Sequence, residues 1–324
     1  MGLATFHVTS ASSSSNQNKN NDIEDDTIFT ASNEFYTLTF DKSTGGLKSI
    51  KNLKSNVETT LSMNMGWYNS SVGGCTKYGS DVPENLREPS CDDQKSGAYI
   101  FRPNSSTFFY PGPSDKPVVT LTSQGDVVTE VSQVFSEWAT AKYRLYANQP
   151  YVEVEWTVGP IPMTTSWIPS SINATENWGK EIVMRYETSL ESNGTFYTDS
   201  NGKELIRRVY NKRGASYPDP YVMKEYSKND IKMLCSNKQK ITPHKQTIEC
   251  NRYNISEEVA GNYYPVNAMI SIDDGVNELA ILADVSVAGG SLSSGSAELM
   301  VHRRLQDDDS RGVQEPLNET MCGT

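Results

Sequence analysis

The segment Glu298–Pro316, ELMVHRRLQDDDSRGVQEP, concentrates the side chains of this sequence that are most able to do chemistry. It holds three arginines and five acids within nineteen residues. Such a mixture can form a solvated loop, a network of ion pairs or an edge that binds a sugar. Glycoside hydrolysis needs two carboxyl groups about 5–10 Å apart across the scissile bond. Because Asp307, Asp308 and Asp309 are adjacent, their side chains cannot all face one substrate in that geometry.

Ion pairing therefore offers a simpler use for these acids. Arginine can bind adjacent carboxylates with two parallel hydrogen bonds, which fixes the shape of a loop. We expect structural ion pairs that involve Arg303, Arg304, Asp308 and Asp309, with Arg311 as a further partner. The alternative, that one arginine or the loop backbone touches a ligand, stays open.

Signatures of other catalytic machinery are missing from the sequence. Its three histidines, His7, His244 and His302, are far apart, and no HxD, HExxH or CxxC motif occurs. His302 is followed by two arginines, which disfavour a bound cation. No GxSxG, GxGxxG or P-loop motif occurs either. We therefore predict no catalytic residue, no metal ligand and no bound cofactor in this chain.

Charge and composition exclude several classes of partner. The 324 residues carry a formal net charge of −11, with a pI near 4.9. Such acidity argues against nucleic acid and against an anionic membrane surface. No run approaches the ~20 apolar residues of a membrane span. The N-terminal stretch MGLATFHVTSASSSS lacks the basic start and the long apolar core of a signal peptide.

The body of the chain nevertheless has features of a secreted glycoprotein. Cys75 and Cys91 bracket one polar loop, and Cys235 and Cys250 bracket another, so we expect two disulfides. Each would close a loop of ~15 residues and stabilise the fold by about 3 kcal/mol. Cys322 is left over, which suggests a missing partner or missing chain. Six N-x-S/T sequons predict glycosylation, at Asn69, Asn104, Asn173, Asn193, Asn254 and Asn318.

The elements that must position these residues are strands. Leu38 and Phe40 alternate with threonines, and the stretch YVEVEWTV from Tyr151 to Val158 puts valines and Trp156 on one side. Ile182, Met184 and Tyr186 repeat the pattern, and so do two later runs around residues 270–272 and 279–283. No long helical period occurs between them. The pattern predicts an all-β fold, a large antiparallel β-sandwich.

Longer strings in this sequence resemble a known family. NEFYTLTFD, TGGLKSI, SGAYIFRPN, VAGNYYPVNAMISI and ELMVHRRLQDDDSRGVQEPLNE occur in this order. They are similar to the C-terminal β-region of the class II α-mannosidases, glycoside hydrolase family 38, with the lysosomal branch nearest. The resemblance covers roughly Leu3 to Asn318 and implies a galactose mutarotase-like supersandwich. It divides the chain into a remnant strand of a preceding small β domain (1–9), a Ser/Asn-rich acidic linker (10–27), the β-sandwich domain (28–318) and a truncated tail (319–324).

The resemblance also implies a function. Members are zinc-dependent retaining α-mannosidases, and an N-terminal α/β domain holds the HxD zinc motif, the nucleophile and the acid. This chain is then the non-catalytic β-sandwich part, inactive alone, of a lysosomal or secreted enzyme that releases terminal α-D-mannose from glycoprotein N-glycans. Its partners are the catalytic α/β domain and, through the whole enzyme, mannose-containing glycans. The family's tyrosine of SGAY, here Tyr99, and its arginine of DDxRG, here Arg311, are expected to lie near the substrate.

Two other hypotheses remain. The 31 aromatic residues, 17 of them tyrosine, can stack on sugar rings as well as fill a β-sheet core. The chain could therefore be a free-standing secreted carbohydrate-binding module. A third hypothesis is an independent glycosidase that uses Asp308 and Asp309, whose replacement by Asn would then abolish activity.

Overall fold

The computed structural model describes residues 27–71, 95–112, 116–163, 179–211, 259–309, 312 and 314–318. Apart from one 3-10 turn, η5 (Ala260–Asn262), every regular element in these ranges is a strand. The all-β prediction is confirmed. The strands are β1 (Ile28–Ser32), β2 (Tyr36–Asp41), β3 (Gly46–Asn52), β4 (Val57–Asn69), β5 (Val118–Gln124), β6 (Val128–Ser136), β7 (Ala139–Tyr146), β8 (Glu153–Val158), β9 (Lys180–Thr188), β10 (Thr195–Asp199), β11 (Leu205–Val209), β12 (Tyr263–Val266), β13 (Met269–Asp273), β14 (Glu278–Leu282), β15 (Val287–Gly290) and β16 (Ser296–Arg304).

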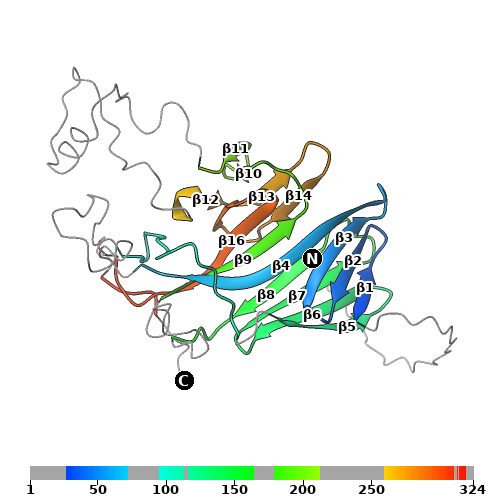
Figure 1. Ribbon diagram of the computed structural model, residues 1–324, viewed down its shortest axis with the longest axis horizontal. Helices are drawn as coiled ribbons and strands as arrows, with labels where there is room; N and C mark the ends of the chain where they lie inside the picture. Colours follow the sequence, from blue (N-terminus) through cyan, green and yellow to red (C-terminus); the bar gives the residue numbers. More distant parts are fainter. Residues whose placement is uncertain are drawn as a thin grey trace, which may run out of the picture.

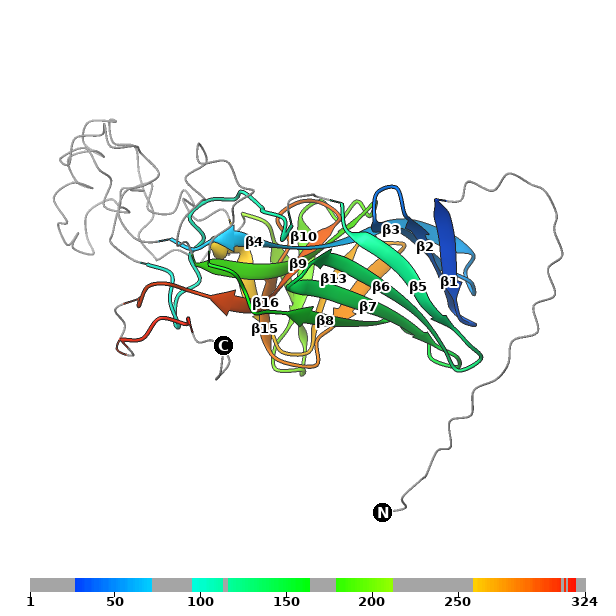
Figure 2. The same ribbon diagram turned by 90° about the horizontal axis from the view of Figure 1, so that it is seen from below.

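These strands form one long sheet and two smaller ones (Figure 1). The long sheet has eight strands in the order β1-β2-β3-β4-β9-β16-β15-β12. The smaller sheets have four strands each, in the orders β5-β6-β7-β8 and β11-β10-β13-β14. All paired strands run antiparallel, and in Figure 2 the two smaller sheets lie along different parts of the long sheet. No helix in the described ranges is long and apolar enough to cross a membrane.

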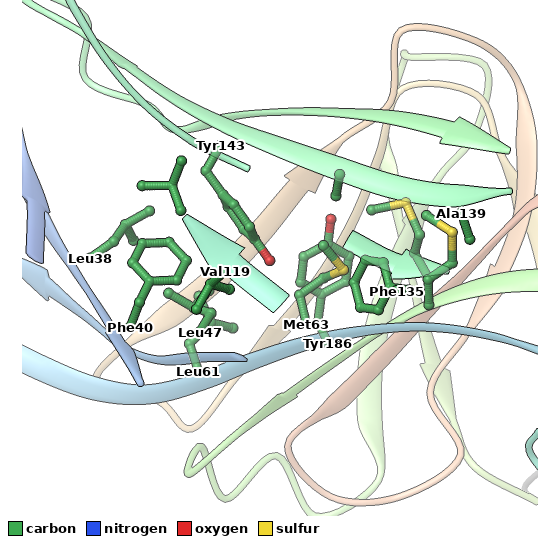
Figure 3. Close-up of a cluster of buried hydrophobic side chains, with 14 of the residues drawn as sticks. Leu38, Phe40, Leu47, Leu61, Met63, Val119, Phe135, Ala139, Tyr143 and Tyr186 are labelled. Carbon is green, nitrogen blue, oxygen red and sulfur yellow. The ribbon is translucent and has the colours of Figure 1, made fainter. Parts of the chain in front are cut away.

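The larger core lies between β1–β4 with β9 on one side and β5–β8 on the other. Leu38 and Phe40, which alternation placed on one face of β2, are buried there. Figure 3 shows them beside Tyr143 of β7, and the rings of Phe40 and Tyr143 meet edge to face with centroids 5.2 Å apart. Aromatic pairs of this kind add to the free energy gained by burying apolar surface.

A second core lies between β16 of the long sheet and the neighbouring strands β10 and β13 of the second small sheet. Phe196, Ile270 and Ile272 pack there against Ala297 and Leu299. Leu299 is paired with Met184 of β9, and directly opposed residues of an antiparallel pair share a face. Met184 belongs to the larger core. Both smaller sheets therefore cover the same face of the long sheet.

One polar connection ties the two layers of the larger core together. The phenol of Tyr143 donates to Gln133 Oε1 at 2.6 Å, and Gln133 Nε2 donates to the carbonyl of Gly45 at 3.0 Å. Gly45 has φ +72° in the turn between β2 and β3, and a Cβ there would lie 1.5 Å from the carbonyl oxygen of Pro117. The turn between β2 and β3 therefore needs glycine at position 45 both for its backbone conformation and for this close approach.

Candidate functional site

The face of the long sheet that the two smaller sheets leave uncovered carries buried charges. On this face Arg303 of β16 lies opposite Glu181 of β9, and Glu298 lies opposite Arg185. Between the two pairs, Val183 lies opposite Met300. Tyr68 of β4 lies opposite Glu181 and extends the row across a third strand. Register alone therefore brings two oppositely charged pairs to one face of adjacent strands.

The Glu181–Arg303 pair is fully formed and shielded from solvent. Arg303 Nε donates to Glu181 Oε2 at 2.6 Å, and Arg303 Nη2 donates to Glu181 Oε1 at 3.0 Å. The Glu181 side chain is 0% exposed and that of Arg303 17%. The hydroxyl of Ser96 also donates to Glu181 Oε1. A bidentate pair of this type has strict geometry, so it can fix whatever is attached to it.

A short turn, Ser96–Arg102, is attached to this pair. Arg303 Nη2 donates to the carbonyl of Ile100 at 2.8 Å, and the N–H of Arg102 donates to Ser96 Oγ at 3.1 Å. Within the turn, the N–H of Gly97 donates to the carbonyl of Ile100 at 3.0 Å. The turn is therefore anchored on strands that are remote from it in sequence.

Tyr99 stands at the outer side of this turn. Its side chain is 64% exposed, although the turn beneath it is anchored. Its backbone N–H donates to Asp309 Oδ2 at 2.7 Å, and Asp309 is only 3% exposed. A Cβ on Gly97 would lie 2.4 Å from the Cβ of Asp309, so only glycine fits there. The structure thus presents one aromatic ring to solvent from a rigid base.

The second buried pair, Glu298 with Arg185, lies on the same face, and two tyrosines also bind its carboxylate. Glu298 accepts from Arg185 Nε at 2.5 Å, from Tyr263 at 2.5 Å and from Tyr68 at 3.0 Å. The guanidinium of Arg185 lies over the ring of Phe108, 4.0 Å from its centroid. Burial and, next, the carboxylate of Glu298 raise the pKa of Tyr68 and of Tyr263 far above the ordinary value, so both phenols remain donors.

A cavity of about 190 Å³ adjoins this second pair. Arg185, Glu187, Glu298, Ser106 and Tyr210 contribute to its wall. The carboxylate of Glu298 already accepts from three side chains, so it is not available as a general base. Glu181 is similarly occupied by Arg303 and Ser96. These two acids hold structure and do not form the acid pair of a glycosidase.

A further cation, Lys180, is buried where β9 begins. Its Nζ donates to the carbonyls of Pro162 and Met163 at 2.7 and 2.9 Å, and it lies 5.5 Å from the centroid of the Trp67 ring. Burial and, next, the charge of Arg304 lower the pKa of Lys180 to about 8. Lys180 and Arg304 together bind a run of carbonyl groups, because Arg304 Nη1 donates to the carbonyl of Ile161.

Charged side chains of the segment Glu298–Pro316 bind partners that lie outside that segment. Arg303 does form an ion pair, but with Glu181 of the neighbouring strand. Asp307 pairs with Lys95 at 2.7 Å. Arg304 binds the backbone of residue 161, and Asp309 binds the backbone of Tyr99. The long-range partners come from β9 and from the 95–102 region, which local spacing could not reveal. Asp308 is half-buried beside them, and Arg311 lies outside the described residues.

The predicted glycosylation sites fall in different surroundings. Asn69 is 6% exposed, and its Oδ1 accepts from Trp67 Nε1 at 3.0 Å, so we expect no glycan there. Asn193 and Asn318 are exposed, and Asn104 is half-buried. Asn173 and Asn254 lie outside the described residues. So do the four cysteines of the predicted disulfides, Cys75, Cys91, Cys235 and Cys250.

The described residues do not fit a zinc ion. No group of three or more His, Cys, Asp or Glu side chains in these ranges is placed to hold a metal. His302 is exposed on β16, beside Arg303. Two acids of this region, Glu181 and Asp307, are engaged by Arg303 and Lys95.

Comparison with known families gives a direct match to this β-sandwich. Residues 31–311 match the model of the glycosyl hydrolases family 38 C-terminal domain. The chain belongs to this family. The family 38 domain thus includes every strand from β2 to β16, together with the turn that carries Tyr99.

Similar proteins are α-mannosidases. Lysosomal α-mannosidase of Mus musculus is 38% identical over 91% of this chain, and that of Bos taurus is 36% identical over 98%. An α-mannosidase of Canavalia ensiformis is 32% identical over 88% of the chain. The matched region is 23%, 25% and 23% of these relatives, respectively. The family 38 domain described here therefore spans about a quarter of the length of the relatives it matches.

Several residues of the site were not found from the sequence. Glu181 and Arg185 lie on the polar side of a strand whose other side is apolar, which normally indicates exposure to water. Their only sequence signal is an acid and an arginine four residues apart in KEIVMRYE, opposite HRR and ELM on β16. Recognising the pairs required the register of β9 against β16.

Proposed function

We propose that this chain is the C-terminal β-sandwich part of a zinc-dependent retaining α-mannosidase that removes terminal α-D-mannose from glycoprotein N-glycans. Membership of the family 38 domain and similarity to α-mannosidases along nearly the whole chain support this proposal. The observation on which it chiefly depends is the exposed ring of Tyr99, held on a buried ion pair. An exposed aromatic on a rigid base suits a sugar ring, because stacking gains from preorganisation.

In this proposal the chain supplies one wall of the substrate cleft. Tyr99 faces the sugar, and the resemblance assigns Arg311 of the DDxRG string a role toward the same substrate. The bond-breaking groups and the zinc belong to the catalytic α/β domain of such an enzyme, where zinc polarises and orients the substrate. The engaged states of Glu181 and Glu298 support a structural role for the acids of this chain. We expect the 324-residue chain alone not to hydrolyse mannosides.

The proposed setting is the lysosome or the secretory pathway. The names of the mammalian relatives support a lysosomal setting. The exposed sequon at Asn193 is compatible with it, because Asn193 lies in a tight turn with φ +51° at the start of β10. A glycan can project from that turn without disturbing the sheet.

The test is to recover the natural protein and assay it. An antibody raised against Ile28–Asn69, which forms β1–β4, would capture the native polypeptide from its source. We expect the captured protein to hydrolyse an aryl α-mannoside, to lose that activity with a chelator and to regain it with zinc. The 324-residue chain, produced alone, is the matched control and should be inactive. Captured protein that binds mannan without hydrolysing any α-mannoside would refute the proposal in favour of a free-standing binding module.

A further inference from the structure

We infer that Asp309 is a positioning residue that sets the orientation of Tyr99 toward the sugar. This inference rests on the proposed function, because it assumes that Tyr99 contacts substrate. It goes beyond that function by assigning a role to a buried carboxylate that touches no substrate itself. Asp309 binds the backbone of Tyr99 and leaves the phenol ring exposed.

A hydrogen bond from Tyr99 to Asp309 joins two segments that are distant in sequence. Tyr99 and Asp309 are 210 residues apart, yet the Tyr99 N–H and Asp309 Oδ2 are separated by only 2.7 Å. Gly97 gives the closest approach, because any Cβ at that position would overlap the Cβ and backbone nitrogen of Asp309. A hydrogen bond to a charged, buried acceptor is among the stronger ones in proteins.

A second anchor fixes the other end of the same turn. Arg303, held by Glu181, donates to the carbonyl of Ile100, one residue after Tyr99. The carboxylate of Asp309 holds the peptide group before Tyr99. The peptide group after Tyr99 is held within the turn, because the Ile100 N–H donates to the carbonyl of Gly97 at 3.2 Å. With the peptide groups on both sides of Tyr99 fixed, the Cα–Cβ direction of Tyr99 is fixed as well. Without Asp309, the turn keeps the Arg303 anchor, and the peptide of Tyr99 is free to rotate.

The experiment uses four variants: Asp309→Ala, Asp309→Asn, Tyr99→Ala and the double Asp309→Ala/Tyr99→Ala. Asn keeps an oxygen acceptor for the Tyr99 N–H, so it is the rescue variant. The matched control is Asp274→Ala. Asp274 Oδ1 accepts the N–H groups of Val276 and Asn277 at 2.9 and 2.8 Å, so it also binds backbone, but in the exposed turn between β13 and β14.

Amide exchange in the 324-residue chain tests the hydrogen bond between Tyr99 and Asp309 by itself. Loss of the hydrogen bond should make the Tyr99 amide exchange at least about tenfold faster in Asp309→Ala. Asp309→Asn and Asp274→Ala should retain the protection of Tyr99. Unchanged exchange in Asp309→Ala would overturn the inference, whatever the activity of the enzyme.

Kinetics of the whole enzyme, produced with each substitution and compared with the native enzyme, test the consequence. Asp309→Ala should lower kcat/KM for an α-mannoside by about 3- to 10-fold, as much as Tyr99→Ala, because both lose one aromatic contact. The double variant should be no worse than Tyr99→Ala, since Asp309 acts through Tyr99. Asp309→Asn should stay within about twofold of the native enzyme. Equal, additive losses in the double variant would reject a positioning role.

Two further outcomes separate this inference from the proposed function. Suppose that Tyr99→Ala leaves the kinetics unchanged while Asp309→Ala speeds exchange of the Tyr99 amide. The assigned role of Tyr99 is then wrong, and Asp309 is merely structural. If Asp309→Ala fails to fold, Asp309→Leu replaces it, because leucine fills a similar space and offers no acceptor to the Tyr99 N–H. Asp309→Leu should then reproduce both the faster exchange and the loss of kcat/KM, and a native value of either would overturn the inference.

Discussion

Both faces of β9 and β16 carry buried side chains, but different forces hold the two faces together. One face presents Ile182, Met184 and Leu299 to the cores beneath the smaller sheets. The other presents Glu181 with Arg303 and Glu298 with Arg185 to a cover of loops and turns. Val183 and Met300 on that second face are buried as well. The same two strands therefore combine an apolar face with a charged face whose carboxylates, Glu181 and Glu298, are also buried.

This difference separates stability from positioning. Apolar contacts are non-directional and tolerate small shifts, whereas a bidentate ion pair is strict in distance and angle. Replacing a buried ion pair by apolar residues often leaves stability unchanged or higher. We therefore assign fold stability mainly to the apolar face. The charged face fixes the turn that carries Tyr99.

The largest effect should come from removing one partner of the charged face. In Glu181→Ala the guanidinium of Arg303 stays buried without its carboxylate. We expect a loss of about 3–5 kcal/mol in the free energy of unfolding, measured by urea denaturation of the 324-residue chain. A loss below about 1 kcal/mol would show that Arg303 finds solvent or another acceptor at little cost.

The double variant Glu181→Leu/Arg303→Met sharpens the comparison. It removes both charges and keeps a similar volume, so most of the lost stability should return. The Ile100 carbonyl nevertheless loses its hydrogen bond from Arg303, and the Ser96 hydroxyl loses its acceptor on Glu181. Amide exchange in the turn around Tyr99 should therefore be faster than in the native chain. A double variant as unstable as Glu181→Ala would show that the charged face contributes stability that apolar packing cannot supply.

An intermediate effect is expected on the apolar face. Met184 is 2% exposed at the centre of the long sheet, and Met184→Ala leaves a cavity there. The free energy of unfolding should fall by about 3 kcal/mol. Exchange of the Tyr99 amide should not change at low denaturant, because the turn is anchored on the opposite face. Leu282→Ala, at a position 73% exposed on β14, is the control and should cost less than about 0.5 kcal/mol.

The sequence predicts the apolar face and misses the charged one for a physical reason. Alternation in β2, β8 and β9 gave the strands and the inward side chains, such as Phe40, Trp156 and Met184. Alternation also places Glu181 in water, and the structure buries it. Its cover comes from Ser96, 85 residues earlier, and from Arg303, 122 residues later. Pairing at such separations depends on the assembled sheet, which no local pattern encodes.

The segment around Asp307–Asp309 gives the same lesson. Its composition indicated ion pairs, and Arg303 and Asp307 do form them, but with Glu181 and Lys95. The resemblance to the family, which uses long strings of sequence, placed Tyr99 in a special role that composition could not suggest. The structure adds the contact that explains its placement, the hydrogen bond from its N–H to Asp309.

A smaller effect is expected where a carboxylate is held by backbone alone. Asp199 accepts the N–H groups of Asn267, Ala268 and Met269 on Oδ1 and that of Gly202 on Oδ2. The Ala268 N–H, with the other three, lowers the pKa of Asp199 to about 2. Asp199→Asn should lower the free energy of unfolding by about 2 kcal/mol at pH 7.

The pH dependence of this difference follows from the direction of the shift. The pKa of Asp199 in the folded chain is below the ordinary value of 3.8, so the stabilisation is complete above pH 3.8 and is lost as pH falls through about 2. Acid titration of unfolding for the native chain and for Asp199→Asn should therefore converge between pH 3.8 and 2. Parallel curves over that range would show that the charge of Asp199 is not responsible.

The smallest effect concerns Lys180, a buried cation that contacts two carbonyl groups and an aromatic ring. Its pKa is lowered from 10.5 to about 8, first by burial. Between pH 8 and 10.5 the unfolded chain binds more protons at this lysine than the folded chain, so stability rises with pH there. The native chain should gain about 1 kcal/mol over Lys180→Arg between pH 7 and 9, because arginine does not titrate in this range. Since other groups titrate equally in both proteins, an unchanged difference would mean that the carbonyls of Pro162 and Met163 hold the lysine charged, as an ion pair holds Arg303.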